Sequence, residues 1–233
     1  MKPLVIARRE FAGFWWSMPN PVIAGVTMAL AGVFFANSVT SNSRASLGPA
    51  FEQIGLVLVL VVPVLTMRLL AEEARVGSLD VLLTQPVTDH GVVIGKFIGA
   101  LAIVVTVLAP VALYVLFLYL YGEPSGGVVL TSLLGFGLLA ALLVAVGLLT
   151  SALTSSQMLA AGIGVLGGLV LWSTAVLERA PGQLSALGRV SALDRLRDFT
   201  SGTLETTNVV YFLTLTAAAL YIAVRALSAR RLR

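Results

Sequence analysis

Six long stretches without charged residues constrain this chain more than any other feature of its sequence. They cover residues 21–39, 54–67 (continuing through 69–71), 97–121, 128–151, 158–177 and 209–224. A transmembrane helix needs about 20 mostly apolar residues, and none of these stretches shows the alternation of a membrane β-strand. The sequence therefore predicts an all-α polytopic integral membrane protein with six transmembrane helices.

The composition excludes the main alternatives. Of the 233 residues, 58 % are hydrophobic and 11 % are charged, whereas a soluble domain has about 45–50 % and about 25 %. Neither a soluble globular domain nor a disordered chain fits these values. The chain has no cysteine and one histidine, His90, which excludes disulfide frameworks and thiol catalysis and leaves little room for a metal site.

The sequence lacks the residues that several enzymatic and transport functions require. The charge-free stretches hold none of the ionisable side chains that ion-coupled transporters and intramembrane metalloproteases place inside the membrane. The sequence GVVIGKF at 91–97 does not have the spacing of a phosphate loop, and no hydroxyl residue follows Lys96. We expect a non-catalytic chain with no catalytic residue, no cofactor and no metal of its own.

Residues 1–19 are predicted to form a helix lying in the membrane interface. Read as a helix, one side carries Leu4, Val5, Phe11 and Trp15, and another carries Lys2, Arg9 and Glu10. Trp15 and Trp16 suit the headgroup level of a bilayer. The alternative is a short charged tail.

Charge distribution predicts the orientation. Six spans place both termini on one side, and the loops and tails of that side hold ten Lys and Arg residues against five on the other. Cytoplasmic segments are enriched in Lys and Arg. We therefore expect a multi-pass protein of the plasma (inner) membrane with both termini cytoplasmic.

Small residues and prolines mark the packing of the spans. Gly164 and Gly168 form a G-x-x-x-G pattern, which allows close helix approach within the chain or between two chains. Pro63 and Pro110 are expected to kink their helices.

The loop at 72–94, between the second and third spans, carries the most information. Its leucines at 79, 82 and 83 predict a short helix over 78–84 with one apolar face, ended by Pro86. An exposed apolar face of this kind is typical of a surface that contacts another protein or the membrane. From the residues alone two interpretations stay open: the helix docks onto a partner protein, or it lies on lipid headgroups or on the bundle.

This loop resembles the membrane subunits of type-2 ATP-binding-cassette (ABC) transporters. Their pattern is an acidic residue, a glycine, a Leu-rich turn, a proline, and then Gly-Lys at the third helix. It is matched here by Glu73, Gly77, Leu79, Leu82, Leu83, Pro86, Gly95 and Lys96. The stretch LDRLRDFTSGTLETTNVVYFLTLT at 193–216 is similar to the segment before the last helix in the gliding-motility-type branch of this class.

The resemblance implies a single transmembrane domain over 1–233, with spans in 20–71 and 95–177 and the last span and a basic tail in 207–233. The extracytoplasmic loop at 178–206 would hold short helices in the outer leaflet. The loop at 72–94 would hold a cytoplasmic coupling helix seated on a separate ABC ATPase, which binds ATP and Mg²⁺. The residues implied for that contact are Glu72, Glu73, Arg75, Gly77, Leu79, Asp80, Leu82, Leu83 and Pro86.

The implied partners are two ATPase subunits, a second permease that is identical or homologous, and membrane lipid, with no nucleic acid. The implied function is that of a permease subunit, with export as the expected direction. The alternative is a non-transporting membrane anchor that passes ATP-driven motion to an extracytoplasmic partner protein. An energy-independent channel or a membrane enzyme fits poorly, because the spans lack polar residues.

Overall fold

The computed structural model describes residues 3–16, 19–41, 48–77, 88–121, 125–177 and 191–231. All regular structure within these ranges is helical. The helices are α1 (Pro3–Trp15), α2 (Pro19–Ser41), α3 (Gly48–Thr66), α4 (Arg68–Val76), α6 (Asp89–Leu108), α7 (Val111–Tyr121), α8 (Gly126–Leu153), α9 (Gln157–Leu177), α11 (Ala192–Thr200) and α12 (Thr206–Arg231).

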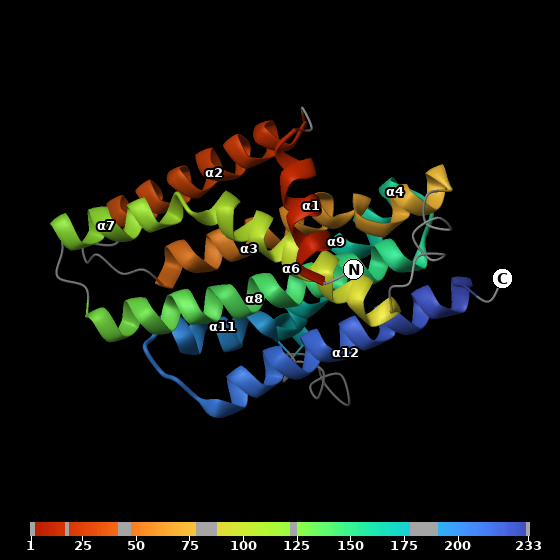
Figure 1. The fold of residues 1–233 in the computed structure, drawn as a ribbon. Helices are drawn as coiled ribbons and strands as arrows, with labels where there is room; N and C mark the ends of the chain where they lie inside the picture. The colour runs from red at the N-terminus through yellow and green to blue at the C-terminus, as the bar shows by residue number, and fades with distance from the viewer. Residues whose placement is uncertain are drawn as a thin grey trace.

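Helix α8 forms the centre of the bundle (Figure 1). It packs against α3, α4, α6, α9, α11 and α12. Its buried side chains include Leu139, Leu143 and Leu148, and Phe136 meets Phe51 of α3 edge to face with ring centroids 5.1 Å apart. A helix that is apolar on all sides is typical of the core of a membrane bundle.

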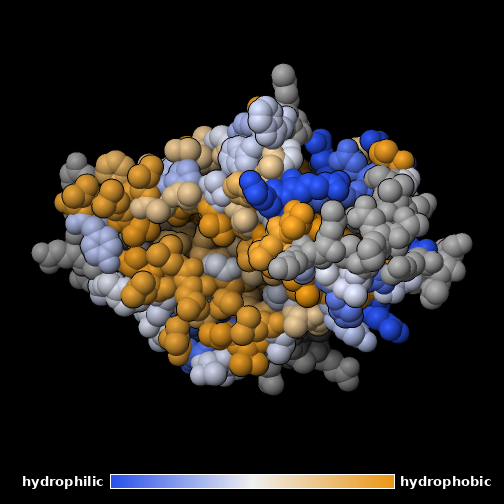
Figure 2. Space-filling view, in the orientation of Figure 1, coloured by the Kyte–Doolittle hydropathy of each residue, from blue (hydrophilic) through white to orange (hydrophobic). Residues whose placement is uncertain are grey.

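Four helical stretches among the described residues are long and apolar enough to cross a membrane. They are Ala50–Val76, Asp89–Phe117, Gly126–Leu153 and Thr206–Arg230. Two shorter apolar stretches, Pro21–Asn37 and Gln157–Trp172, coincide with the first and fifth predicted spans. Apolar side chains cover much of one face of the bundle, while hydrophilic ones gather near α1 and α4 (Figure 2). The fold is that of a helical membrane protein, and the number of six spans stays a prediction.

One of the two prolines within the predicted spans interrupts a helix, and the other lies inside one. Helix α6 ends at Leu108 and α7 begins at Val111, so Pro110 separates them. Pro63 lies inside α3, three residues before that helix ends at Thr66. Proline cannot donate the hydrogen bond of a regular helix, which weakens the turn around it.

The charged loop is shorter than the sequence predicts, because helices enter it from both sides. Helix α4 continues to Val76, and Gly77 ends it with a left-handed φ of 76°. Helix α6 begins at Asp89, where the hydroxyl of Thr88 accepts a hydrogen bond from the Gly91 amide at 3.2 Å. Thr88 is a favourable N-cap, and Asp89 suits the positive end of the helix dipole.

The G-x-x-x-G pattern of α9 packs inside the chain. A Cβ on Gly164 would lie 2.9 Å from Pro63 Cβ, and one on Gly168 would lie 3.0 Å from Val59 Cγ1. Both neighbours belong to α3. Of the two interpretations of this pattern, the structure therefore shows contact within one chain.

Candidate functional site

A buried ion cluster joins three helices at the end of the bundle that carries α4. Lys96 lies in the second turn of α6, and its side chain is 1 % exposed. Its Nζ donates hydrogen bonds to Glu10 Oε1 of α1 at 2.7 Å and to Glu73 Oε1 of α4 at 2.9 Å. Desolvating an ammonium group is costly unless carboxylates compensate it at this distance. Lys96 therefore lies buried within α6 and not at the loop boundary.

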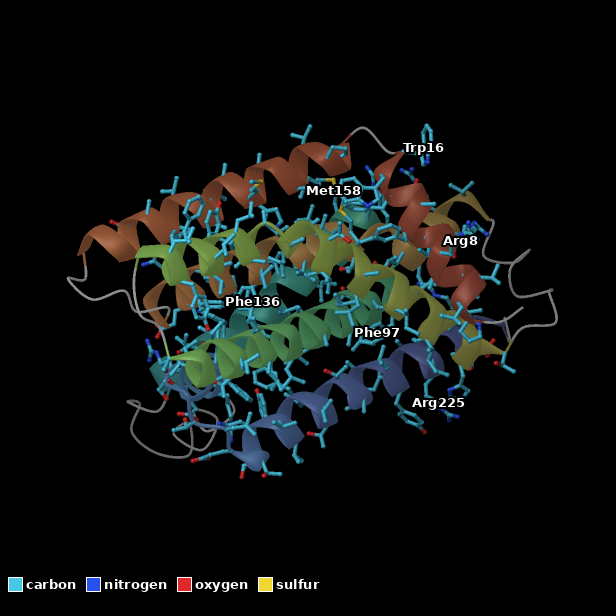
Figure 3. All side chains as sticks on the ribbon, turned by 60° about the vertical axis from the view of Figure 1, so that its left-hand side comes forward. Arg8, Trp16, Phe97, Phe136, Met158 and Arg225 are labelled. Atoms are coloured by element: carbon cyan, nitrogen blue, oxygen red, sulfur yellow. The ribbon has the colours of Figure 1, made fainter. Side chains whose placement is uncertain are left out.

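The ion cluster identifies the side of α1 that faces the bundle. Ile6, Ala7 and Phe14 are buried, and Glu10 lies on the same side, facing Lys96. Leu4 is 69 % exposed. Glu10 thus lies on a different side from Leu4, as the sequence predicts, and this side faces the lysine of α6. Arg8 and Trp16 point away from the bundle (Figure 3).

Two glycines of α6 allow α1 to approach closely enough for these ion pairs. A Cβ on Gly95 would lie 2.8 Å from the Pro3 carbonyl oxygen, and one on Gly99 would lie 2.9 Å from Glu10 Cβ. Small residues four apart permit this backbone approach. The G-x-x-x-G spacing of 95 and 99 was visible in the sequence and was missed.

A serine from α8 caps the start of α4. Ser151 Oγ accepts hydrogen bonds from the amides of Leu70 and Ala71, both at 2.9 Å, and donates one to the Met67 carbonyl at 3.0 Å. The first amides of a helix have no partner within it. Helix α3 ends at Thr66 and α4 begins at Arg68. The first amides of α4 therefore depend on α8 for these hydrogen bonds.

Ser151→Ala is expected to lower the free energy of unfolding by about 1–3 kcal/mol, because two buried amides lose their acceptor. Thermal unfolding in detergent measures the change. Ser155, which is exposed four residues further on, supplies the control variant Ser155→Ala. Equal melting temperatures of the two variants would contradict the capping role.

The structure describes four of the residues implied for the ATPase contact. Glu72, Glu73 and Arg75 lie on α4, and Gly77 ends it. Arg75 is exposed, whereas Glu73 faces Lys96. The remaining residues, Leu79, Asp80, Leu82, Leu83 and Pro86, lie outside the described residues. The predicted short helix at 78–84 falls there as well, so the contact and this helix stay predictions.

A cavity of about 370 Å³ lies next to the ion cluster, between α1, α3, α4 and α6. Its charged lining residues are Arg9, Glu10, Arg68, Glu72, Glu73 and Lys96. Its apolar lining residues are Phe14, Leu65, Leu69 and Ile103. Within the described ranges no group of three His, Cys, Asp or Glu residues could hold a metal ion.

A second polar network fixes α11 at the opposite end of the bundle. Arg195 of α11 donates to Asn208 Oδ1 of α12, and Asn208 Nδ2 donates to Asp198 Oδ2 at 2.8 Å. Arg197 donates to Glu52 of α3 at 3.0 Å, and this hydrogen bond raises the pKa of Arg197 above its ordinary value. Phe199 anchors the other face of α11, since it is fully buried.

These features define an integral membrane protein whose charged groups gather at the ends of an apolar helical bundle. The family model of the ABC-2 family transporter protein matches residues 26–231. The chain belongs to this family, and it is therefore a membrane-embedded permease subunit of an ABC transporter. A search of curated proteins finds no match to the chain.

Proposed function

We propose that this permease subunit couples ATP hydrolysis by a separate ABC ATPase to the export of a substrate. The observation that carries the proposal is the family match over 26–231, which includes α4, α6 and the segment between them. Membership in this family implies an ABC ATPase partner. Hydrolysis would belong to that partner, with ATP and Mg²⁺ bound there.

The ion cluster supports a coupling role for the segment 78–87. The described helices on either side of it, α4 and α6, are joined by Glu73 and Lys96 at 2.9 Å. At the start of α6, directly after this segment, the hydroxyl of Ser228 of α12 donates a hydrogen bond to Asp89 Oδ2 at 2.8 Å. A force applied to the segment would therefore reach three helices. We infer that the ATPase acts at this end, which then faces the cytoplasm together with both termini.

The proposal extends to the class of substrate and to the composition of the transporter. The surfaces of the spans are Leu-, Val- and Ala-rich, so an apolar or amphiphilic substrate fits better than a sugar. Two permeases, identical or homologous, and two ATPases would form the working unit in the plasma membrane. Within the family, we place the chain in the gliding-motility-type branch. The likeness of residues 193–216 to the segment before the last helix in that branch supports this placement.

The coupling role is tested by replacing Leu82 and Leu83 together with aspartate. If their side chains are buried in the ATPase, the double variant should co-purify at least about tenfold less ATPase than the wild type, since each buried leucine contributes about 1.5–3 kcal/mol. ATP turnover in proteoliposomes should fall in parallel. Mass spectrometry of the purified complex identifies the ATPase.

Leu204→Asp is the control, because Leu204 is exposed at the opposite end of the bundle. It should leave both quantities unchanged. A Leu82/Leu83 variant with normal ATPase recovery and turnover would refute the coupling contact and leave the family assignment intact.

The alternative function is a non-transporting anchor that moves an extracytoplasmic partner protein. The network that joins α11 to α3 and α12 favours it, since a rigid surface at that end could transmit force. Vesicles with active ATPase but no movement of lipid or amphiphile, together with capture of a large extracytoplasmic protein, would support the anchor over the exporter.

A further inference from the structure

The cavity beside the ion cluster combines an apolar wall with charged groups at the level of the membrane surface. Leu65 and Ile103 belong to two candidate spans. Phe14 comes from α1, whose Trp16 is 91 % exposed at the end of the helix. Indole side chains concentrate at the headgroup level of bilayers. The cavity therefore lies where the hydrocarbon region meets the headgroups.

Charges of both signs line the cavity in equal number. The guanidinium groups are those of Arg9 and Arg68, and Glu72 supplies a carboxylate beside them. The ion cluster adds two carboxylates and one ammonium, and so one further negative charge. A purely anionic ligand would meet the guanidinium groups but would also lie close to the carboxylate of Glu72. A ligand with both a phosphate and an ammonium group would match both signs.

We propose that this cavity binds the headgroup of a zwitterionic phosphoethanolamine lipid. The phosphate would contact the guanidinium groups of Arg9 and Arg68, which form strong charge-assisted bonds with phosphate. The ammonium group would contact Glu72. The glycerol and the first acyl carbons would lie against the apolar wall formed by Phe14, Leu65 and Ile103.

The size and position of the cavity agree with this ligand. Its volume of about 370 Å³ lies within the range of about 300–1,000 Å³ of small-ligand sites. Because Arg9 belongs to α1 and Arg68 to α4, one lipid would bridge two helices that the Lys96 cluster already holds together. Glu72 and Glu73 of the lining are also among the residues implied for the ATPase contact. The test of lipid binding nevertheless needs neither the ATPase nor a transported substrate.

Native mass spectrometry of the delipidated full-length chain tests the proposal. Phosphatidylethanolamine and phosphatidylglycerol with identical acyl chains are added at equal concentration. The wild type should retain one phosphatidylethanolamine per chain and at least about tenfold less phosphatidylglycerol, the ratio expected when one charge-assisted bond is lost. Equal retention of the two lipids would overturn the proposal.

Two variants locate the site. The double variant Arg9→Ala/Arg68→Ala should retain at least about tenfold less phosphatidylethanolamine than the wild type. The single variant Glu72→Gln should shift the lipid preference toward phosphatidylglycerol. The control pair, Arg8→Ala and Arg225→Ala, removes the same charge from exposed positions that do not line the cavity. Equal lipid loss in both pairs would overturn the site. The lipid preference of the wild type can be measured whether or not the variants fold. Displacement of the bound lipid by soluble phosphoethanolamine at equal concentration would overturn the lipid assignment.

Discussion

Lys96→Met is expected to lower the free energy of unfolding by about 3–5 kcal/mol, the loss typical of removing one partner from a buried ion pair. Glu10 and Glu73 would then face each other with no cation between them. Thermal unfolding in detergent, followed by intrinsic tryptophan fluorescence, measures the change. Arg225→Met is the control, since Arg225 is an exposed cation of α12 (Figure 3).

A triple variant separates charge from packing. Adding Glu10→Met and Glu73→Met to Lys96→Met removes the uncompensated carboxylates, so most of the lost stability should return. Replacing a buried ion cluster with apolar groups of similar volume is often neutral or stabilising. Failure of the triple variant to recover would show that the lysine stem and not its charge stabilises this region.

Gly99→Leu should displace α1 from α6. The new side chain would need the space that Ala7 and Glu10 occupy, because even a Cβ would lie 3.0 Å from the Ala7 carbonyl oxygen. Overpacking of this kind costs about 1–3 kcal/mol, and here it also separates Glu10 from Lys96. The chain has no cysteine, so Ile6→Cys introduces a single buried thiol. Maleimide should label that thiol about tenfold or more faster in the Gly99→Leu background.

Gly137→Leu supplies the matched control. No atom lies within 4 Å of a Cβ built on Gly137 of α8, so this substitution should leave the labelling rate of the Ile6→Cys thiol unchanged. Equal acceleration in both backgrounds would mean that α1 is not held by the glycines of α6.

The apolar stretches of the sequence located the helices well, because bilayer thickness sets the length of an apolar run. The ends of the helices were located less well. Helix α6 begins at Asp89, before its apolar run, because Thr88 caps it and Ser228 of α12 binds Asp89. The Thr88 cap is a local contact, whereas the contact of Asp89 with Ser228 depends on α12, 139 residues away in the chain.

The ion cluster shows why the candidate site was only partly predictable. Glu73 and Lys96 both belong to the family pattern, yet their pairing depends on how α4 and α6 approach each other. Glu10 is 86 residues from Lys96, and only the tertiary fold brings them together. The spacing of Gly95 and Gly99 was the available signal, since it marks a surface that another helix contacts closely.

The position of Glu10 also has a consequence for synthesis. The ribosome completes α1 long before Lys96 emerges, so α1 first meets the membrane without the cation that it later contacts. Its docking must wait for α4 and α6, because contacts between distant segments form only after both have been synthesised. Once made, this contact distinguishes a chain in which α6 has joined α1 and α4 from one in which it has not.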